Sequence, residues 1–282
     1  MSSPTTTSRP GHHRPRTMLA SGGGDPTNRR AGRRKAFRTI ATVMAVSGVL
    51  FGVFTAVFGI VSEAQKIHAF HNAVVAALLL VLAAPPAIAA ARAPERAGAP
   101  LVHLVALSAA GLGTMLLGQK IDVFTLPFIV FVGVLVALRV ASFDALRSGH
   151  WSVPLAILVV TAAVPLMTYA VGEAELQRVD TSSEHAEFNH WVEMSFVAVA
   201  VLMLGALTAL RPAAFRLSAW SVGVTLAVLG AASITFSGYA SAMSESWAWA
   251  ALAGGVAFVV LAEFARRRFQ RQEASRQPGG SR

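Results

Sequence analysis

The chain has no cysteine and few charged residues. The absence of cysteine excludes disulfide bonds, thiolate metal sites and cysteine-dependent catalysis. Charged residues make up 13% of the 282 residues, compared with roughly 25% in soluble domains. Together with a hydrophobic content of 54%, this deficit indicates an integral membrane protein.

The long apolar runs have no lysine or acidic residue near their centres. A retinal Schiff base needs a lysine within a span, and proton-coupled carriers usually place ionisable groups deep in the helix bundle. The sequence also contains no P-loop, no Gly-x-Ser-x-Gly motif and no His-Glu-x-x-His motif. These absences argue against a proton-coupled carrier and against the enzyme classes that use those motifs.

What the chain does contain is a series of apolar runs of about 18–20 residues or more, the length that crosses a bilayer as a helix. They predict an all-α integral membrane protein with about eight transmembrane helices. Prolines inside several runs are compatible with this assignment, because neighbouring helices satisfy the freed backbone groups. The predicted spans are 38–61, 69–91, 101–118, 122–140, 152–172, 191–210, 217–239 and 247–264.

Four regions follow from this pattern. Residues 1–36 are rich in Ser, Thr, Pro, Gly and Arg and are predicted to be a disordered, basic cytoplasmic tail. Residues 37–148 and 149–268 each contain four of the predicted spans. Residues 269–282 are predicted to be a second, short cytoplasmic tail.

The charge distribution predicts the orientation in the membrane. With a cytoplasmic amino terminus and alternating spans, all but three of the 24 lysine and arginine residues lie on the cytoplasmic side; the exceptions are Lys66, Lys120 and Arg178. The net charge of +10 is therefore a topology signal and does not indicate nucleic-acid binding. We expect residues 29–38 to contact anionic lipid head groups. Because lysine is scarce beside arginine and alanine, we place the protein in a bacterial cytoplasmic (inner) membrane, with both termini inside.

Matching segments suggest that the two halves are repeats. Val61-Ser-Glu63-Ala64 at the end of the first span resembles Val171-Gly-Glu173-Ala174 at the end of the fifth. Likewise, Ala69-Phe70-His71-Asn72 at the start of the second span resembles Glu187-Phe188-Asn189-His190 before the sixth. Four spans per half preserve the orientation, so the halves are predicted to be parallel repeats about an axis along the membrane normal. Both histidine segments would then lie on the outer face.

The spacing of histidine and glutamate within these segments favours a site. His68 and His71 are three residues apart and share one face if a helix already begins before them. Glu187, His190 and Glu193 form a second stripe with the same spacing. Helix N-termini disfavour imidazolium and therefore leave neutral imidazole, the form that binds metals. Glu193 lies at the apolar boundary and needs a partner, either His71 or His190.

These residues define a predicted outward-facing metal site. Imidazole and carboxylate ligands suit Zn or Fe, whereas imidazole and thioether ligands suit Cu(I). Four methionines fall in the outer half of the predicted bundle: Met115, Met167, Met194 and Met243. The cofactor is therefore expected to be heme or an ion of Cu, Zn or Fe. The predicted ligands or supporting residues are His68, His71, His185, His190, Glu193 and Glu63.

The alternative interpretation is that these side chains only decorate the membrane–water interface. Histidine and tryptophan are ordinary residues there, and Trp191, Trp247 and Trp249 fit an aromatic belt. The recurrence of histidine in both halves argues for a site. His103 and His150 are predicted on the cytoplasmic side and receive no role.

Four-plus-four helices with histidines at their outer mouths resemble the heme A synthase group and, more loosely, the CopD-type copper-resistance membrane proteins. Glu63 followed by His68 is similar to the Glu/His entry of the heme A synthase halves. That family also places histidines at the outer starts of spans four and eight, where this chain has Asp122 or Phe124, and Ser246 or Trp247. The resemblance therefore implies an analogy of architecture, which by itself implies no function.

Three functions follow as hypotheses. The first is a membrane protein that binds a metal or heme at its outer face, for cofactor handling, copper tolerance or membrane redox chemistry. The second is a small-solute transporter or channel whose acidic outer face attracts the solute. The third is a non-catalytic assembly or anchoring subunit. The sequence predicts neither a specific protein partner nor a specific enzymatic reaction.

Overall fold

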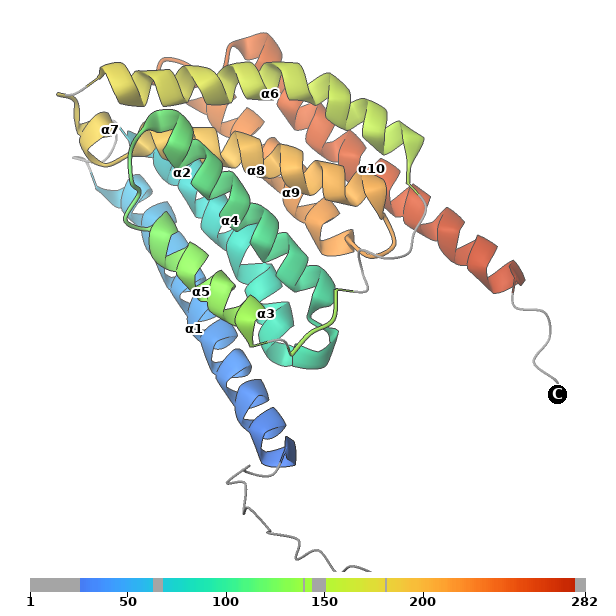
Figure 1. The fold of residues 1–282 in the computed structure, drawn as a ribbon. Helices are drawn as coiled ribbons and strands as arrows, with labels where there is room; N and C mark the ends of the chain where they lie inside the picture. Colours follow the sequence, from blue (N-terminus) through green and yellow to red (C-terminus); the bar gives the residue numbers. More distant parts are fainter. Residues whose placement is uncertain (1–25, 63–67, 139, 144–150, 181, 277–282) are drawn as a thin grey trace, which may run out of the picture.

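A computed structural model describes residues 26–62, 68–138, 140–143, 151–180 and 182–276 (Figure 1). Throughout these segments the regular structure is helical, and they contain no β-strand. Seven helices are long and apolar enough to cross a membrane, and Thr125–Ala137 is a shorter apolar helix. The prediction of an all-α integral membrane protein is confirmed.

The helices follow the predicted spans closely in most places. The second span is continuous but changes geometry along its length, from α-helix to a π-helical turn and back. Its elements are α2 (Ala69–Ala77), the π-helix Leu78–Ala83 and α3 (Ala84–Arg92), and the 3-10 turn Pro94–Arg96 follows. The remaining helices are α1 (Pro26–Val61), α4 (Gly98–Gly118), α5 (Thr125–Ala137), α6 (Val153–Val179), α7 (Glu184–Glu187), α8 (His190–Leu210), α9 (Arg216–Thr235) and α10 (Glu245–Arg276).

Both predicted tails are partly helical in the structure. The first helix begins at Pro26, so the prediction of disorder is wrong for residues 26–36. Proline fits the first helical turn, and the arginine, lysine and alanine that follow favour helix, so α1 extends past its apolar part. Likewise, α10 continues to Arg276, eight residues beyond the predicted boundary at 268.

The predicted fourth span, 122–140, forms a helix of only 13 residues. Asp122 stops the helix from starting earlier, because its buried carboxylate accepts hydrogen bonds from the backbone N–H groups of Phe124 and Thr125 at 3.2 and 2.9 Å. A carboxylate that caps a helix in this way fixes the first residue of the helix. The result is a helix shorter than the roughly 20 residues that usually cross a bilayer.

Two consecutive prolines explain the irregular second span. Pro85 and Pro86 have no N–H group, so the carbonyls of Val81 and Leu82, four residues earlier, lose their usual helical partners. The π-helical turn Leu78–Ala83 precedes this point. Carbonyls left unpaired inside a membrane bundle cost free energy unless another group donates to them.

Two side chains supply the missing donors. The Ser221 hydroxyl donates to the Val81 carbonyl at 2.8 Å, and His103 Nε2 donates to the Leu82 carbonyl at 2.9 Å. His103 Nδ1 in turn lies 2.9 Å from Ser218 Oγ. His103 is therefore the neutral Nε2–H tautomer, and it joins α4 and α9 to the proline-interrupted span.

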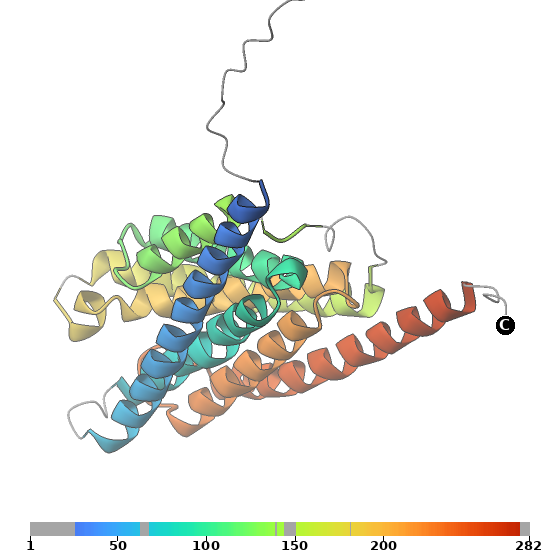
Figure 2. The same ribbon diagram turned by 90° about the horizontal axis from the view of Figure 1, so that it is seen from below.

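Helices α4, α8 and α9 form the centre of the bundle, whereas most of the apolar surface of α1, α6 and α10 is exposed (Figures 1 and 2). Within the halves, α6 packs on α8 and α9 packs on α10. Between the halves, α2 packs on α9 and α4 packs on α8. In the predicted repeat, α2 corresponds to α8 and α4 corresponds to α9, so the α2–α9 contact corresponds to the α8–α4 contact. This symmetry is what parallel repeats require, and the repeat itself stays a prediction.

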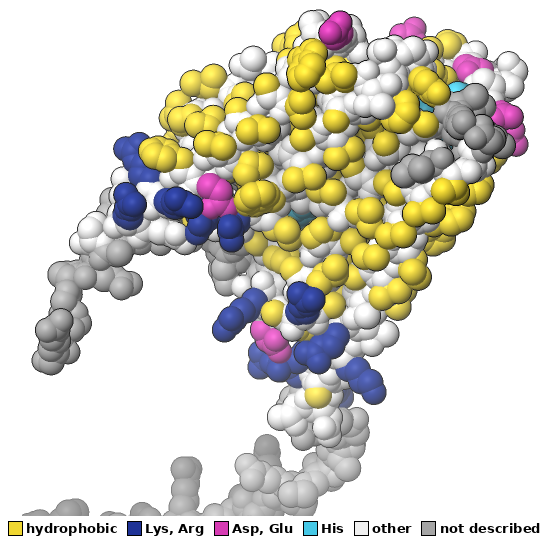
Figure 3. All heavy atoms as spheres, turned by 180° about the vertical axis from the view of Figure 1, so that it is seen from behind, with side chains coloured by type: hydrophobic (Ala, Val, Ile, Leu, Met, Phe, Trp, Pro, Cys, Tyr) yellow, Lys and Arg dark blue, Asp and Glu magenta, His cyan; other side chains and the backbone are white. Residues whose placement is uncertain are grey.

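Charge separates along the bundle. On the face shown in Figure 3, the visible Lys and Arg side chains gather at one end, around the start of α1 and along the last turns of α10. Lys120 and Arg178 lie elsewhere, at a pocket beside α7. Most of the acidic side chains visible on this face lie toward the other end. The histidine-bearing start of α2 and the turn α7 belong to that acidic end.

Candidate metal centre

The structure brings together the four histidines that the sequence singled out. The His185 ring centroid lies 4.6 Å from that of His68 and 4.7 Å from that of His71. The His190 centroid is 4.9 and 5.0 Å from the same two rings. His68 and His71 come from the start of α2, His185 from α7, and His190 opens α8. One site thus contains the histidine segments of both halves.

Three of the rings present nitrogen atoms that can share an ion. One ring nitrogen each from His68, His71 and His185 lies within 4.8 Å of the other two. Nδ1 of His68, Nδ1 of His71 and Nε2 of His185 are buried and have no hydrogen-bond partner among the described residues. Because a buried polar atom without a partner costs free energy, this arrangement needs an explanation, and a bound ligand provides one.

Hydrogen bonding fixes the tautomer of His71. The Ser241 hydroxyl donates its single proton to Glu173 Oε2 at 2.6 Å. The same hydroxyl oxygen lies 3.1 Å from His71 Nε2. Because its own proton is already donated to Glu173, the oxygen accepts a hydrogen bond from His71 Nε2–H. His71 therefore keeps its lone pair on Nδ1, the atom without a protein partner.

His190 and His68 are oriented in a similar way. His190 Nδ1 lies 3.0 Å from Glu193 Oε2, and His68 Nε2 lies 3.3 Å from Glu184 Oε2. When the two carboxylates are ionised they only accept, and then these nitrogens carry the protons and the opposite nitrogen of each ring carries the lone pair. Metal-binding histidines typically donate their second N–H to a carboxylate in this way. Of the two partners expected for Glu193, the structure selects His190.

The backbone is unusual at two residues of the site. Asn189 and Ser241 have positive φ angles of 62° and 65°. Non-glycine residues in this region are strained, and they concentrate at functional sites. Asn189 turns the chain from α7 into α8 directly before His190, and Ser241 presents its hydroxyl to His71.

Trp191 is not part of an aromatic belt. Its side chain is buried, 6% exposed, and its ring stacks on His185 with a centroid distance of 5.0 Å and an interplanar angle of 23°. Trp247 and Trp249, in contrast, are exposed, as expected for a belt. Trp191 therefore helps to bury His185.

Two predicted carboxylates do not contribute to the described site. Glu187 has the expected spacing from His190, but Asn189 interrupts the helix between them and Glu187 is exposed. Glu63 lies outside the described residues. The glutamates that face histidines are instead Glu184 and Glu193, together with Glu173, which acts through Ser241.

The methionines do not join the histidines. The Met115 sulfur accepts the backbone N–H of Asp122 at 3.3 Å, and Met194 is fully buried in the hydrophobic core. Met243 lines an apolar groove, and Met167 is exposed. The described donor set is therefore imidazole nitrogen supported by carboxylates.

Sequence reasoning missed Glu173, Tyr169 and Ser241 as parts of this network. Glu173 belongs to a matching segment at the end of the fifth span, which was predicted to stop at residue 172, and it is not among the predicted ligands. In the structure α6 continues to Val179, so Glu173 is buried within a helix. Ser241 is one serine among many, and only its backbone conformation distinguishes it.

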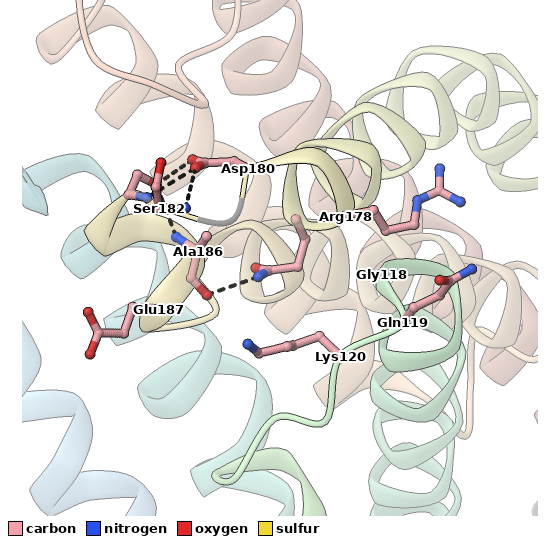
Figure 4. A pocket seen from close by; sticks show the side chains of 10 residues that line it. Gly118, Gln119, Lys120, Arg178, Asp180, Ser182, Ala186 and Glu187 are labelled. Carbon is pink, nitrogen blue, oxygen red and sulfur yellow. Dashed lines mark hydrogen bonds between the residues drawn. The ribbon is translucent and has the colours of Figure 1, made fainter.

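An open pocket of about 450 Å³ adjoins α7 on the outer side of the site (Figure 4). Lys120, Arg178, Asp180 and Glu187 line it. The Gln177 side-chain amide donates to the Ala186 carbonyl at 2.9 Å and so ties α7 to the end of α6. The pocket is therefore polar and lies beside the turn that carries His185, although none of the four histidines lines it.

The loop between α6 and α7 is held in place by Asp180. Its carboxylate accepts the hydroxyl and the backbone N–H of Ser183 and the backbone N–H of Ser182. These hydrogen bonds lower the pKa of Asp180 below its ordinary value. Asp180 therefore stays ionised and keeps α7, which carries His185, in position.

The environment keeps His185 neutral. Burial is the largest cause that lowers its pKa from the ordinary value of 6.5, and the neighbouring His68 and His190 add to the effect. Asp180 and Glu184 oppose the shift less strongly. A neutral ring retains the lone pair that a metal ion requires.

Comparisons with known protein families, with curated proteins and with solved structures find no match to this chain.

Proposed function

We propose that this protein binds a transition-metal ion through His68, His71 and His185 at the outer face of a membrane. The observation that carries the proposal is the convergence of one ring nitrogen from each of these histidines within 4.8 Å. In His68 and His71, Nε2 is directed to a carboxylate or to a serine bound to a carboxylate, and the buried Nδ1 has no partner among the described residues. This combination of converging nitrogens and oriented rings is typical of metal sites.

The geometry favours a single ion over heme. Nitrogens bound to one tetrahedral zinc at about 2.0–2.1 Å are roughly 3.4 Å apart, so the observed group needs only a small contraction. The six pairs among the four histidine rings have centroid distances of 4.6–6.4 Å, and four of the six lie at 4.6–5.0 Å, so a porphyrin would have to enter a closely packed group of rings. Imidazole ligands without thioether or thiolate suit Zn²⁺, Cu²⁺ or Fe²⁺.

Three protein ligands leave a coordination position open, as in catalytic zinc sites. The His190 ring lies 4.9 and 5.0 Å from those of His68 and His71, and its Nδ1 contacts Glu193, so its Nε2 would be available to the ion or to a water molecule bound to it. Such an ion would supply Lewis acidity. The chain itself supplies orientation of the rings, partial exclusion of water and a nearby proton acceptor.

We further propose that the centre faces outward from a bacterial inner membrane, with both termini in the cytoplasm. The separation of basic and acidic ends in Figure 3 supports this orientation. Residues 29–38 form the basic start of α1, where they would contact anionic lipid head groups.

Elemental analysis of protein purified without chelators tests the proposal. We expect about one transition-metal ion per chain, bound to the wild-type protein and to His150→Ala but lost from the double variant His71→Ala/His185→Ala. His150 is a control because the sequence places it in the basic loop between α5 and α6. A heme absorption band in place of the ion would reject a bare-ion centre. Absence of heme, of bound metal and of pH-dependent metal uptake would reject the site altogether.

A further inference from the structure

A groove of about 580 Å³ runs into the membrane-embedded part of the second half. Side chains from α6, α8, α9 and α10 line it, and its volume lies within the usual range for small-molecule sites. Most of the lining is apolar and includes Val159, Leu166, Leu202, Leu226, Ala251 and Phe258. The rims belong to α6 and α10, whose outward faces are exposed and apolar at Val160, Val164 and Val256. The groove therefore opens toward the hydrocarbon of the bilayer.

Apart from Thr161, the polar side chains that line the groove lie at one end. Thr168, Tyr169 and Ser244 line the outer end, beside Met243 and Trp247. An apolar channel with hydrogen-bonding groups at one end matches a molecule that has a hydrocarbon chain and a polar head. The open rims show how such a molecule would enter, by lateral diffusion from the bilayer.

This polar end is connected to the histidine centre. The Tyr169 hydroxyl donates to the backbone carbonyl of Ser241 at 2.9 Å. Ser241 also contacts His71 and Glu173 through its side chain. A head group beside Tyr169 would thus be one residue away from the hydrogen bond that orients a proposed metal ligand.

We propose that the groove binds a membrane-soluble amphiphile with a hydrocarbon chain, and that it presents the polar head of this molecule to the histidine centre. The role of substrate or effector for that centre rests on the proposed function. Binding of the chain in the groove does not, because the groove is formed by α6, α8, α9 and α10 without any metal.

Gly254 offers a way to fill the groove. It lines the groove, and a Cβ atom added there would meet no other atom within 4 Å. Gly133 in α5 provides a matched control, since a Cβ atom added there also meets nothing within 4 Å and Gly133 does not line the groove. Gly254→Phe should block the groove, whereas Gly133→Phe adds the same side chain elsewhere on a membrane helix.

The experiment is photolabelling of the full chain in lipid nanodiscs with a long-chain fatty acid that carries a diazirine midway along its chain. We expect labelled peptides from the groove walls on α6 and α10, competition by excess unlabelled fatty acid, and loss of this labelling in Gly254→Phe but not in Gly133→Phe. Labelling spread evenly over α1, α5, α6 and α10, without competition, would overturn the proposal. The wild-type competition decides the question even if Gly254→Phe does not fold.

A second measurement separates this inference from the proposed function. Labelling of metal-free protein tests the groove alone, and Co²⁺ uptake tests the centre alone. In Co²⁺-loaded protein, added fatty acid should shift the visible absorption of the ion in wild type and in Gly133→Phe, but not in Gly254→Phe. Groove labelling with no spectral shift would overturn the claim that the head group reaches the centre. Failure to take up Co²⁺ would instead count against the proposed function.

Discussion

Two groups of buried histidines in this protein have almost the same exposure and different surroundings. His103 is 1% exposed, and His68 and His71 are 1% and 0% exposed. Both ring nitrogens of His103 have protein partners, Ser218 and the Leu82 carbonyl. His68 and His71 each have one partnered nitrogen and one buried nitrogen with none.

The difference shows that burial alone does not distinguish a structural histidine from a ligand. A ring whose two nitrogens are satisfied by the fold has no lone pair left for a metal and serves to join helices. A ring with one satisfied and one free nitrogen is oriented and still able to bind. The number of ring nitrogens without a partner therefore distinguishes a histidine that joins helices from one that can bind a metal. Variants of His103 should change stability, whereas variants of His71 should change metal affinity.

The largest expected effect comes from removing one ligand. His71→Ala should weaken metal affinity more than roughly 100-fold, since the loss of a ligand should exceed the 10–100-fold cost of losing a supporting hydrogen bond. The measurement is competitive titration with a chelator of known affinity. His103→Ala should leave both the affinity and the stoichiometry unchanged. Equal losses in the two variants would show that the assignment of roles is wrong.

Removing a supporting carboxylate should have the next largest effect. Glu184→Gln should weaken metal binding about 10–100-fold, because the carboxylate orients His68 and favours its Nδ1 lone pair. Ser241→Ala should weaken it to a similar degree by releasing His71 Nε2. Glu187→Gln, a matched change at an exposed carboxylate, should have no effect in the same titration. A loss of affinity in Glu187→Gln would point to a general electrostatic effect instead of oriented partners.

The effect of pH on metal binding should be smaller than the effects of these substitutions. The pKa of His185 in the folded chain lies below the ordinary value of 6.5, so its ring stays neutral and able to bind at pH 6.5. Metal uptake should therefore be complete above pH 6.5 and decline only at lower pH, as protons occupy the imidazoles. Because the unfolded chain takes up this proton near pH 6.5 and the folded chain does not, metal-free protein should also lose stability as pH falls below 6.5. An uptake midpoint above pH 6.5, measured by titration at several pH values, would contradict this account.

Much of the site could be predicted from the sequence, because the helices impose it. The apolar runs determine where α2 and α8 begin, and those starts place His71 and His190 at the same end of the bundle. The i, i+3 spacing predicted less well which side chains lie together. It linked Glu187 to His190, but the positive φ of Asn189 ends α7 between them, and a single-residue backbone conformation is not visible in the spacing.

Other parts of the structure depend on contacts between distant residues. His103 received no role from the sequence, because its partners come from Leu82 and Ser218, on two other helices. Glu173 received no role from the sequence, because its burial depends on the continuation of α6 to Val179 and on its contact with Ser241. In each case a tertiary hydrogen bond satisfies a polar group that local pattern alone would place in water.

The smallest expected effect concerns the helix-joining histidine and would sharpen the contrast with the metal ligands. His103→Ala removes the donor to the Leu82 carbonyl and should cost about 1–3 kcal/mol of stability, whereas Ser221→Ala should cost about 0.6 kcal/mol, the average for hydrogen bonds between membrane helices. If the cost arises because Pro86 has no N–H to give Leu82, then Pro86→Ala should relieve part of it by supplying that N–H. A double-mutant cycle of His103→Ala and Pro86→Ala, followed by the free energy of unfolding in detergent, should therefore be non-additive, with the double variant more stable than the sum predicts. Additive costs would mean that His103 stabilises the bundle only by filling space, and its hydrogen bond to the proline-interrupted span would then be incidental.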